Sequence, residues 1–213
     1  MRMPSTEQRR LLAEATERYR ASLPLALDYL AGRGIDQITA ERAALGVVAD
    51  PVPGHEKLRG RLSIPYMTEV GPVNMSFRCI QDHDCKLFDN HGKYDKPLGS
   101  PVSLYGVSSY KNADSFICMT EGEMDTIILK MIGLPAIGVS GAGMWQPHWA
   151  SVLQDFSRVY VFSDGDASGQ KFAKRVMLEY EHAIDVPMPA GEDVNSAYLK
   201  LGKQYLLDRI EDE

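Results

Sequence analysis

The sequence predicts an α/β protein, with a mainly parallel sheet flanked by helices and a smaller α+β subdomain before it. Two observations support this. From about residue 112 onward, short apolar segments alternate with amphipathic helical segments. Before residue 112, helical segments are followed by two strand-like segments and a long polar stretch. The chain of 213 residues is long enough for two compact domains. We therefore expect subdomains over residues 1–111 and 112–213.

The first half is expected to begin with a helix over residues 5–22, because Ser5 and Gln8 have capping-box spacing. Further helices are expected over residues 25–31 and 39–44, and strands over residues 61–67 and 73–80. Residues 81–101 are polar and rich in turn-forming residues, which predicts a long loop. Long loops inside compact domains are often binding loops.

The second half alternates strands and helices. Strands are expected over residues 115–119, 135–139, 158–162 and 184–186, and helices over residues 123–132, 146–156, 167–182, 194–201 and 204–210. Strands joined through helices pair in parallel, and helices then cover both faces of the sheet.

Composition excludes several classes of protein. No apolar run approaches the roughly 20 residues of a membrane span, and the N-terminus has no apolar signal segment, so a cytoplasmic location is expected. Three cysteines, an odd number, do not indicate a disulfide framework. The net charge of −6 argues against coating of nucleic acid by bulk charge, but it allows a locally basic groove.

Four acids follow the ends of the expected strands: Glu121, Asp164, Asp166 and Asp193. Ligands bind beyond the carboxyl ends of the strands in open parallel sheets, so these acids are expected at one site. Mg²⁺ and Mn²⁺ prefer such oxygen ligands, and two ions can hold the attacking and leaving oxygens of a phosphoryl transfer. Solvated loop acids are the plainer alternative. Asp125, on the next helix, is expected to orient the Glu121 loop.

Three segments resemble the successive motifs of the TOPRIM domain, which primases, topoisomerases and some nucleases share. They are residues 120–125 (TEGEMD), 163–169 (SDGDASG) and 191–195 (GEDVN). The resemblance covers residues 112–200. It implies metal ligation by Glu121, Asp164, Asp166 and Asp193, with Glu121, Asp164 and Asp166 as catalytic residues. Glu121 is then expected to act as general base or metal organiser for an attacking 3′-hydroxyl.

The first half resembles the RNA-polymerase domain of bacterial-type replicative primases, especially short primase-like proteins of bacteriophages. The similar segments are residues 29–35 (YLAGRGI) and 58–65 (LRGRLSIP). The resemblance implies a nucleotidyltransferase, a DNA primase core that makes short RNA primers. Its template would be single-stranded DNA, its substrates ribonucleoside triphosphates, and its cofactor Mg²⁺ or Mn²⁺.

Basic residues of the first half are expected to form the groove for template and triphosphate: Arg59, Arg61, Arg78, Lys93 and Lys96. Each one alone is more often a solvated surface charge. The sequence shows no N-terminal four-ligand zinc ribbon and no C-terminal helicase-binding domain of the primase type. A replicative helicase and a separate zinc-module protein are therefore candidate partners.

Two further features leave alternatives open. Cys79, His83, Cys85 and His91 are candidates for a zinc site, but their spacings are irregular for structural zinc and favour unliganded loop residues. Trp145 is a candidate for stacking on a base. The competing functions are a TOPRIM-type metal-dependent nuclease, which would not need the basic groove, and a non-catalytic nucleic-acid-binding replication accessory.

Overall fold

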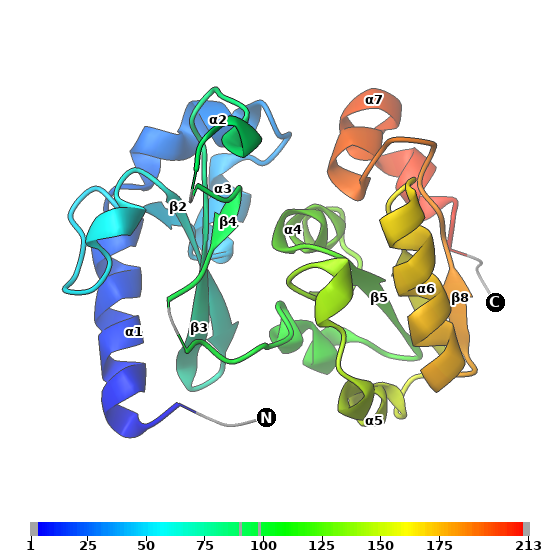
Figure 1. Ribbon diagram of the computed structural model, residues 1–213. Helices are drawn as coiled ribbons and strands as arrows, with labels where there is room; N and C mark the ends of the chain where they lie inside the picture. Colours follow the sequence, from blue (N-terminus) through cyan, green and yellow to red (C-terminus); the bar gives the residue numbers. More distant parts are fainter. Residues whose placement is uncertain (1–3, 90, 98, 211–213) are drawn as a thin grey trace. The chain divides into compact units, whose positions relative to one another are not determined.

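The computed structural model describes residues 4–89, 91–97 and 99–210, and the chain divides into two compact units, Met1–Pro101 and Val102–Glu213 (Figure 1). The boundary lies earlier than the expected one after residue 111. The reason is that the segment after Pro101 packs into the second unit: Leu104 is buried in its core, and Tyr105 forms a β-bridge with Gly138.

The first unit combines helices with a four-stranded antiparallel sheet of order β1-β2-β3-β4. Its strands are β1 (Gly46–Val47), β2 (Leu62–Thr68), β3 (Gly71–Arg78) and β4 (Tyr94–Asp95). Its α-helices are α1 (Thr6–Arg20), α2 (Leu27–Ala31) and α3 (Gln37–Arg42), and its 3₁₀ turns are η1 (Leu23–Ala26), η2 (Glu56–Leu58) and η3 (Cys85–Leu87).

Helix α1 starts at the predicted capping box. The Ser5 side chain accepts a hydrogen bond from the Gln8 backbone N–H at 3.2 Å, and Gln8 Oε1 accepts one from the Ser5 N–H at 2.8 Å. The helix lies along β3 (Figure 1), and its buried Tyr19 packs with Met75 and Phe77 of that strand. This cluster forms part of the core of the first unit.

The second unit has a four-stranded, fully parallel sheet of order β6-β5-β7-β8, which confirms the expected fold class. Its strands are β5 (Phe116–Thr120), β6 (Ala136–Gly138), β7 (Arg158–Phe162) and β8 (Ala183–Asp185). Its α-helices are α4 (Glu123–Met131), α5 (Ala150–Leu153), α6 (Ala167–Glu179) and α7 (Val194–Leu207), and its 3₁₀ turns are η4 (Val107–Asn112), η5 (Ala142–Met144) and η6 (Pro147–Trp149).

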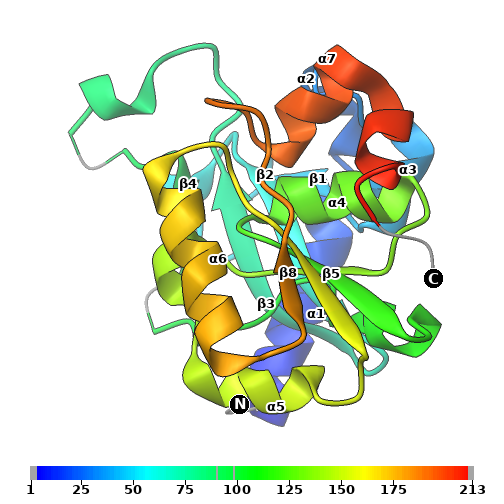
Figure 2. The same cartoon turned by 90° about the vertical axis from the view of Figure 1, so that its right-hand side faces the viewer.

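Helices cover both faces of this sheet. Phe172 and Val176 of α6 and Leu153 of α5 pack with Ile117 and Val161 on one face. Helix α4 contacts β5, β6 and α7, and Figure 2 shows α4 and α6 on opposite sides of the sheet. Because β5 leads into α4 and β7 leads into α6, neighbouring strands send their chains to opposite faces. This reversal places a topological switch point between the carboxyl ends of β5 and β7.

One expected helix differs from the structure. The helix expected over residues 146–156 is a 3₁₀ turn followed by the four-residue α5. The break expected between the two helices after residue 194 is present within α7, at Gly202, whose backbone is non-helical with a φ of 81° that suits a glycine. No helix in the described part of the chain is long and apolar enough to cross a membrane.

Candidate metal and catalytic site

Glu121 and Asp164 meet at the switch point between β5 and β7. Glu121 is the first residue after β5, which ends at Thr120. Asp164 is the second residue after β7, which ends at Phe162. The Asp164 N–H donates a hydrogen bond to Glu121 Oε1 at 3.0 Å, and the Glu121 side chain is buried. The structure thus brings two of the predicted residues into direct contact where the fold favours ligand binding.

Asp166 is the N-cap of α6. Its Oδ1 accepts hydrogen bonds from the N–H groups of Ser168 at 2.7 Å and Gly169 at 2.9 Å. The positive end of the helix dipole further favours a carboxylate at this position. The motif expected to bind metal therefore also starts a helix.

Asp193, another expected metal ligand, is likewise an N-cap, at the start of α7. Its Oδ1 accepts from the Ser196 N–H at 2.7 Å, and Ser196 Oγ accepts from the Asp193 N–H at 2.9 Å. Asp125 of α4 also reaches this helix end, where its Oδ1 accepts from the Asn195 N–H at 3.0 Å. Asp125, expected to orient the Glu121 loop, thus joins α4 to the N-terminus of α7.

Glycines allow the loops after β7 and β8 to approach closely. The Gly165 N–H donates to Glu192 O at 2.8 Å, and the Gly191 N–H donates to Gly165 O at 2.9 Å. A Cβ on Gly165 would stand 1.9 Å from Pro189 O, and one on Gly169 would stand 2.2 Å from Asp164 O. Both positions require glycine for steric reasons, which explains the glycines beside the acidic motifs.

Burial raises the pKa of the Glu121 carboxyl, and the negative charges of Asp166 and Asp125 raise it further. The hydrogen bond from the Asp164 N–H acts in the opposite direction but does not reverse the shift. Glu192, in contrast, is ion-paired with Lys200, and the hydrogen bond from Lys200 lowers the pKa of its carboxyl. Burial and nearby negative charge thus disfavour the ionised form of Glu121.

The oxygen donors of the four acids suit Mg²⁺ or Mn²⁺ by chemical type. The carboxylate oxygens do not converge closely enough to share one metal ion. Across the described residues, only a Cys/His group of the first unit converges in this way. The reason is visible in the contacts above, because backbone N–H groups hold Glu121, Asp166 and Asp193. Mutual repulsion also opposes close approach of carboxylates without a cation.

Two of the five basic residues expected in a groove are buried in the first unit. Arg78 Nε donates to Tyr29 Oη at 2.6 Å, and the guanidinium also donates to Tyr94 Oη and lies over its ring. Arg61 donates to Gly92 O at 2.9 Å. Both arginines therefore make hydrogen bonds that stabilise the first unit.

The other three expected residues are more accessible. Arg59 and Lys93 are exposed, and Arg59 donates to Ala49 O. Lys96 is half-buried, with its Nζ 5.3 Å from the centre of the Tyr66 ring. A pocket of about 730 Å³ is lined in part by four basic residues, Arg33, Arg78, Lys86 and Lys93. Arg78 and Lys93 are two of the five residues expected in the groove. The first unit thus has a partly basic pocket.

The expectation that Trp145 stacks on a base is wrong. Its side chain is fully buried and lies edge-on to Trp149, with ring centroids 5.7 Å apart. Both rings belong to the core that α6 covers. A residue that follows a glycine-rich loop looked accessible in the sequence, but the loop turns it into the core.

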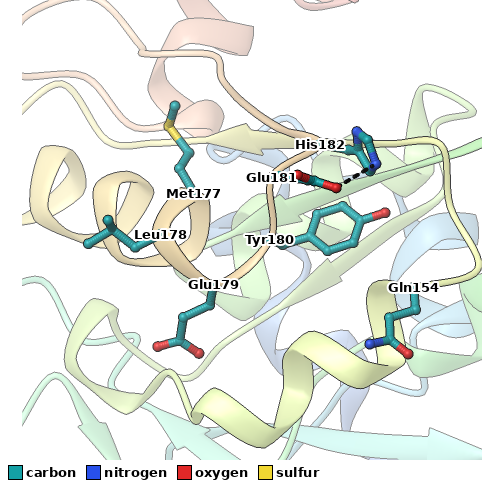
Figure 3. Close-up of a pocket in the computed structure, with 7 residues that line it drawn as sticks. All are labelled: Gln154, Met177, Leu178, Glu179, Tyr180, Glu181 and His182. Atoms are coloured by element: carbon teal, nitrogen blue, oxygen red, sulfur yellow. Dashed lines mark ion pairs between the residues drawn. The ribbon is translucent and has the colours of Figure 1, made fainter.

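A second hollow lies at the opposite edge of the parallel sheet (Figure 3). Gln154, Tyr180 and an ion pair of Glu181 with His182 at 3.5 Å line it. His182 directly precedes β8, so this hollow is at the amino ends of the strands. Ligands of open parallel sheets bind at the other edge, so we assign the hollow no function.

Known proteins provide independent comparisons. The model of the Toprim-like family matches residues 118–198. The Gene 57 protein of Mycobacterium phage D29 is 38% identical over 152 residues, which span 71% of this chain and 99% of that protein.

Solved structures share the fold. The RNA polymerase domain of Mycobacterium tuberculosis primase DnaG aligns with a TM-score of 0.76 at 18% identity, over 97% of this chain and 83% of that chain. A DNA primase domain from Pseudomonas aeruginosa aligns with a TM-score of 0.76 at 21% identity, over 95% and 77%. The chain therefore belongs to the same family as the phage Gene 57 protein, contains a segment that matches the Toprim-like family over residues 118–198, and has the fold of the DnaG primase catalytic core.

Proposed function

We propose that this chain is a primase-type nucleotidyltransferase that synthesises short RNA primers on single-stranded DNA with Mg²⁺ or Mn²⁺. The contact between Glu121 and Asp164 at the switch point carries the proposal, because it joins two acidic motifs where an α/β sheet binds ligands. The fold of the DnaG catalytic core supports a replication function of the primase type.

Glu121, Asp164, Asp166 and Asp193 would hold the metal. A divalent ion bound there supplies positive charge against the phosphate oxygens of the reacting nucleotides. The raised pKa of Glu121 suits a general base, since a carboxylate that resists ionisation accepts a proton more readily. Its Oε1 accepts the Asp164 N–H, so Oε2 is the oxygen proposed to accept the proton of the primer 3′-hydroxyl.

The template and triphosphate are proposed to bind the first unit through its basic residues. A DnaG primase catalytic domain bound to single-stranded DNA has the same fold, with a TM-score of 0.69 at 20% identity over 96% of this chain. Exposed Arg59 and Lys93 suit phosphate contacts, which need no base recognition. Arg61, Arg78 and Lys96 would support these contacts from half-buried or buried positions. A replicative helicase or a separate zinc-module protein would act as partner.

A priming assay tests the function. Purified protein, unprimed single-stranded DNA, Mg²⁺ or Mn²⁺ and labelled ribonucleotides should yield short oligoribonucleotides while the template remains intact. Asp164→Asn together with Asp166→Asn is the matched control, since asparagine preserves the N-cap of α6. Degradation of the template without RNA synthesis would replace the primase proposal with a metal-dependent nuclease. DNA binding without either reaction would favour a non-catalytic accessory.

A further inference from the structure

The loop between β3 and β4 gathers four side chains of the types that bind transition metals. The Sγ atoms of Cys79 and Cys85 and one ring nitrogen each of His83 and His91 all lie within 4.8 Å of one another. In Figure 2 the loop leaves β3 and extends at the upper left before it returns to β4. Across residues 4–89, 91–97 and 99–210, no other group of three or more His, Cys, Asp or Glu side chains gathers in this way.

Four of the six distances between the ligand atoms match a tetrahedral zinc ion, and the other two are within 4.8 Å. Zn–S bonds of about 2.3 Å and Zn–N bonds of about 2.0–2.1 Å place tetrahedral S and N ligands about 3.6 Å apart and two N ligands about 3.3 Å apart. His83 Nε2 lies 3.6 Å from both Cys79 Sγ and Cys85 Sγ. His91 Nε2 lies 3.3 Å from Cys79 Sγ and 3.0 Å from His83 Nε2. Each separation is within a few tenths of an ångström of the expected value.

Hydrogen bonding does not account for this arrangement. His83 Nε2 faces three polar atoms, those of Cys79, Cys85 and His91. One imidazole nitrogen either donates one hydrogen or accepts with one lone pair, so it cannot satisfy three such partners. A cation at the centre satisfies all four ligand atoms at once.

The backbone holds the ligands in place from both sides. Cys79 directly follows β3, and its N–H donates to Lys93 O at 2.9 Å. This bond brings the chain before β4, and with it His91, beside Cys79. Arg61 holds the same segment through Gly92 O at 2.9 Å. Cys79 thus stands on paired backbone, and His91 lies two residues before Lys93, the partner of Cys79.

The contact of Arg61 with His91 changes in the occupied site. Arg61 Nη2 lies 3.3 Å from His91 Nδ1. When Nε2 binds zinc, the neutral ring carries its hydrogen on Nδ1, so both atoms become donors and this contact is no hydrogen bond. The bond from Arg61 to Gly92 O does not depend on the histidine tautomer and remains.

The loop has little other reason to be ordered. Its large apolar residues, Leu87 and Phe88, are 79% and 52% exposed. Phe88 contributes a ring contact with His83, with centroids 4.7 Å apart, but the loop has no buried core of its own. Small segments without a sufficient core are commonly stabilised by a structural metal.

We propose that Cys79, His83, Cys85 and His91 bind one zinc ion as a structural site. Four protein ligands leave no open coordination position, which distinguishes a structural from a catalytic zinc. The ion fixes the loop that bears Lys86 and Lys93 beside Arg78 in the basic pocket. Its ligands belong to the first unit and include none of the four acidic residues, so zinc content can be measured whether or not the chain makes primers.

Metal analysis of the full-length protein tests the site. The protein, purified without added zinc and dialysed against metal-free buffer, should contain about one zinc per chain by mass spectrometry. Cys85→Ser and His83→Ala should each reduce this content at least about tenfold, because loss of one ligand opens the site. His182→Ala and Asp164→Asn together with Asp166→Asn should leave it unchanged, since they alter an exposed histidine and the acidic site.

Cobalt binding keeps the test valid if a ligand variant fails to fold. Zinc-depleted wild-type protein titrated with Co²⁺ should develop the visible bands of a tetrahedral site and sulfur-to-metal charge-transfer bands, which zinc then abolishes. Trypsin should cleave the depleted protein after Lys86 or Lys93 faster than the zinc-bound protein. Absence of both zinc and tetrahedral cobalt bands in folded wild-type protein would overturn the proposal. A disulfide between Cys79 and Cys85 in freshly purified protein would overturn it as well.

Discussion

The acidic loops of the second unit and the Cys/His loop of the first unit differ in how closely their candidate metal ligands approach one another. The Cys/His ligand atoms already lie within 4.8 Å of one another. The acids share one sheet edge, but backbone N–H groups hold Glu121, Asp166 and Asp193 separately. Neutral imidazoles and thiols can approach without a cation, whereas carboxylates repel one another. The first arrangement suits a permanent ion, and the second suits ions that arrive with substrate.

The largest effect is expected at Glu121. Glu121→Gln should reduce primer synthesis by about 10²–10⁴-fold, because the amide cannot act as a general base. It should leave the fold intact, since the amide oxygen can still accept the Asp164 N–H. Rates of RNA synthesis at saturating nucleotide measure the loss. Activity within a few-fold of wild type would exclude Glu121 as the base.

The same carboxyl links stability to pH. Because its pKa is raised in the folded state, the folded protein binds the proton more tightly than the unfolded chain. The free energy of unfolding should therefore fall as pH rises from the usual glutamate pKa through the raised one. Glu121→Gln should remove this part of the pH dependence and raise stability at neutral pH. Urea unfolding of both proteins across pH measures it, and identical pH dependence of the two would contradict the raised pKa.

Close packing of the acidic loops predicts a cost for a methyl group at Gly165. Gly165→Ala should destabilise the protein by about 1–3 kcal/mol, because the Cβ would collide with backbone atoms of Pro189. Gly143→Ala is the control, since nothing lies within 4 Å of its Cβ position. Thermal or urea unfolding compares the two. Equal stabilities would show that the loops after β7 and β8 are not packed as described.

Asp193 allows capping to be separated from metal binding. Asp193→Ala should cost about 1 kcal/mol in the free energy of unfolding, because the N-cap of α7 is lost. Asp193→Asn keeps the cap and should stay within about 0.5 kcal/mol of wild type. Thermal melting with added Mn²⁺ should show a reduced shift in both variants. A full Mn²⁺ shift in Asp193→Asn would remove this residue from the metal site.

The smallest effect is expected on the basic first unit. Lys93→Ala should weaken binding of single-stranded DNA a few-fold and reduce the slope of log affinity against log salt by about 0.7, since one phosphate contact is lost. Lys57→Ala, another exposed lysine of this unit, is the control and should change neither. Fluorescence anisotropy over a salt series measures both. An unchanged slope for Lys93→Ala would place the DNA elsewhere.

Sequence patterns predicted the second unit well for a physical reason. Its apolar strands and amphipathic helices have clear periodicities, and the carboxyl ends of parallel strands necessarily share an edge. The expectation that Glu121 and Asp164 lie together depended on that rule alone. That Asp166 and Asp193 also cap helices was not predicted. The signal was present, because aspartate is a favoured N-cap residue and each of the two directly precedes an expected helix.

The first unit was less predictable because its contacts join residues far apart in sequence. Arg78 is buried against Tyr29, which lies 49 residues away in the sequence. Its charge alone had suggested an exposed side chain, because no local pattern indicates this partner. The Cys/His group assembles only when β3 pairs with β4, and β4 has just two residues, too few to show an alternating pattern. Irregular ligand spacing therefore concealed an arrangement that strand pairing creates.

Extension of an RNA primer already annealed to a DNA template tests the central claim most directly, because it bypasses initiation and any partner needed for it. With Mn²⁺ or Mg²⁺ and ribonucleotides, the wild-type protein should lengthen the primer according to the template. Asp164→Asn together with Asp166→Asn should abolish extension while the protein remains folded. Failure of folded wild-type protein to extend the primer, or equal extension by the double variant, would contradict catalysis by the acidic site.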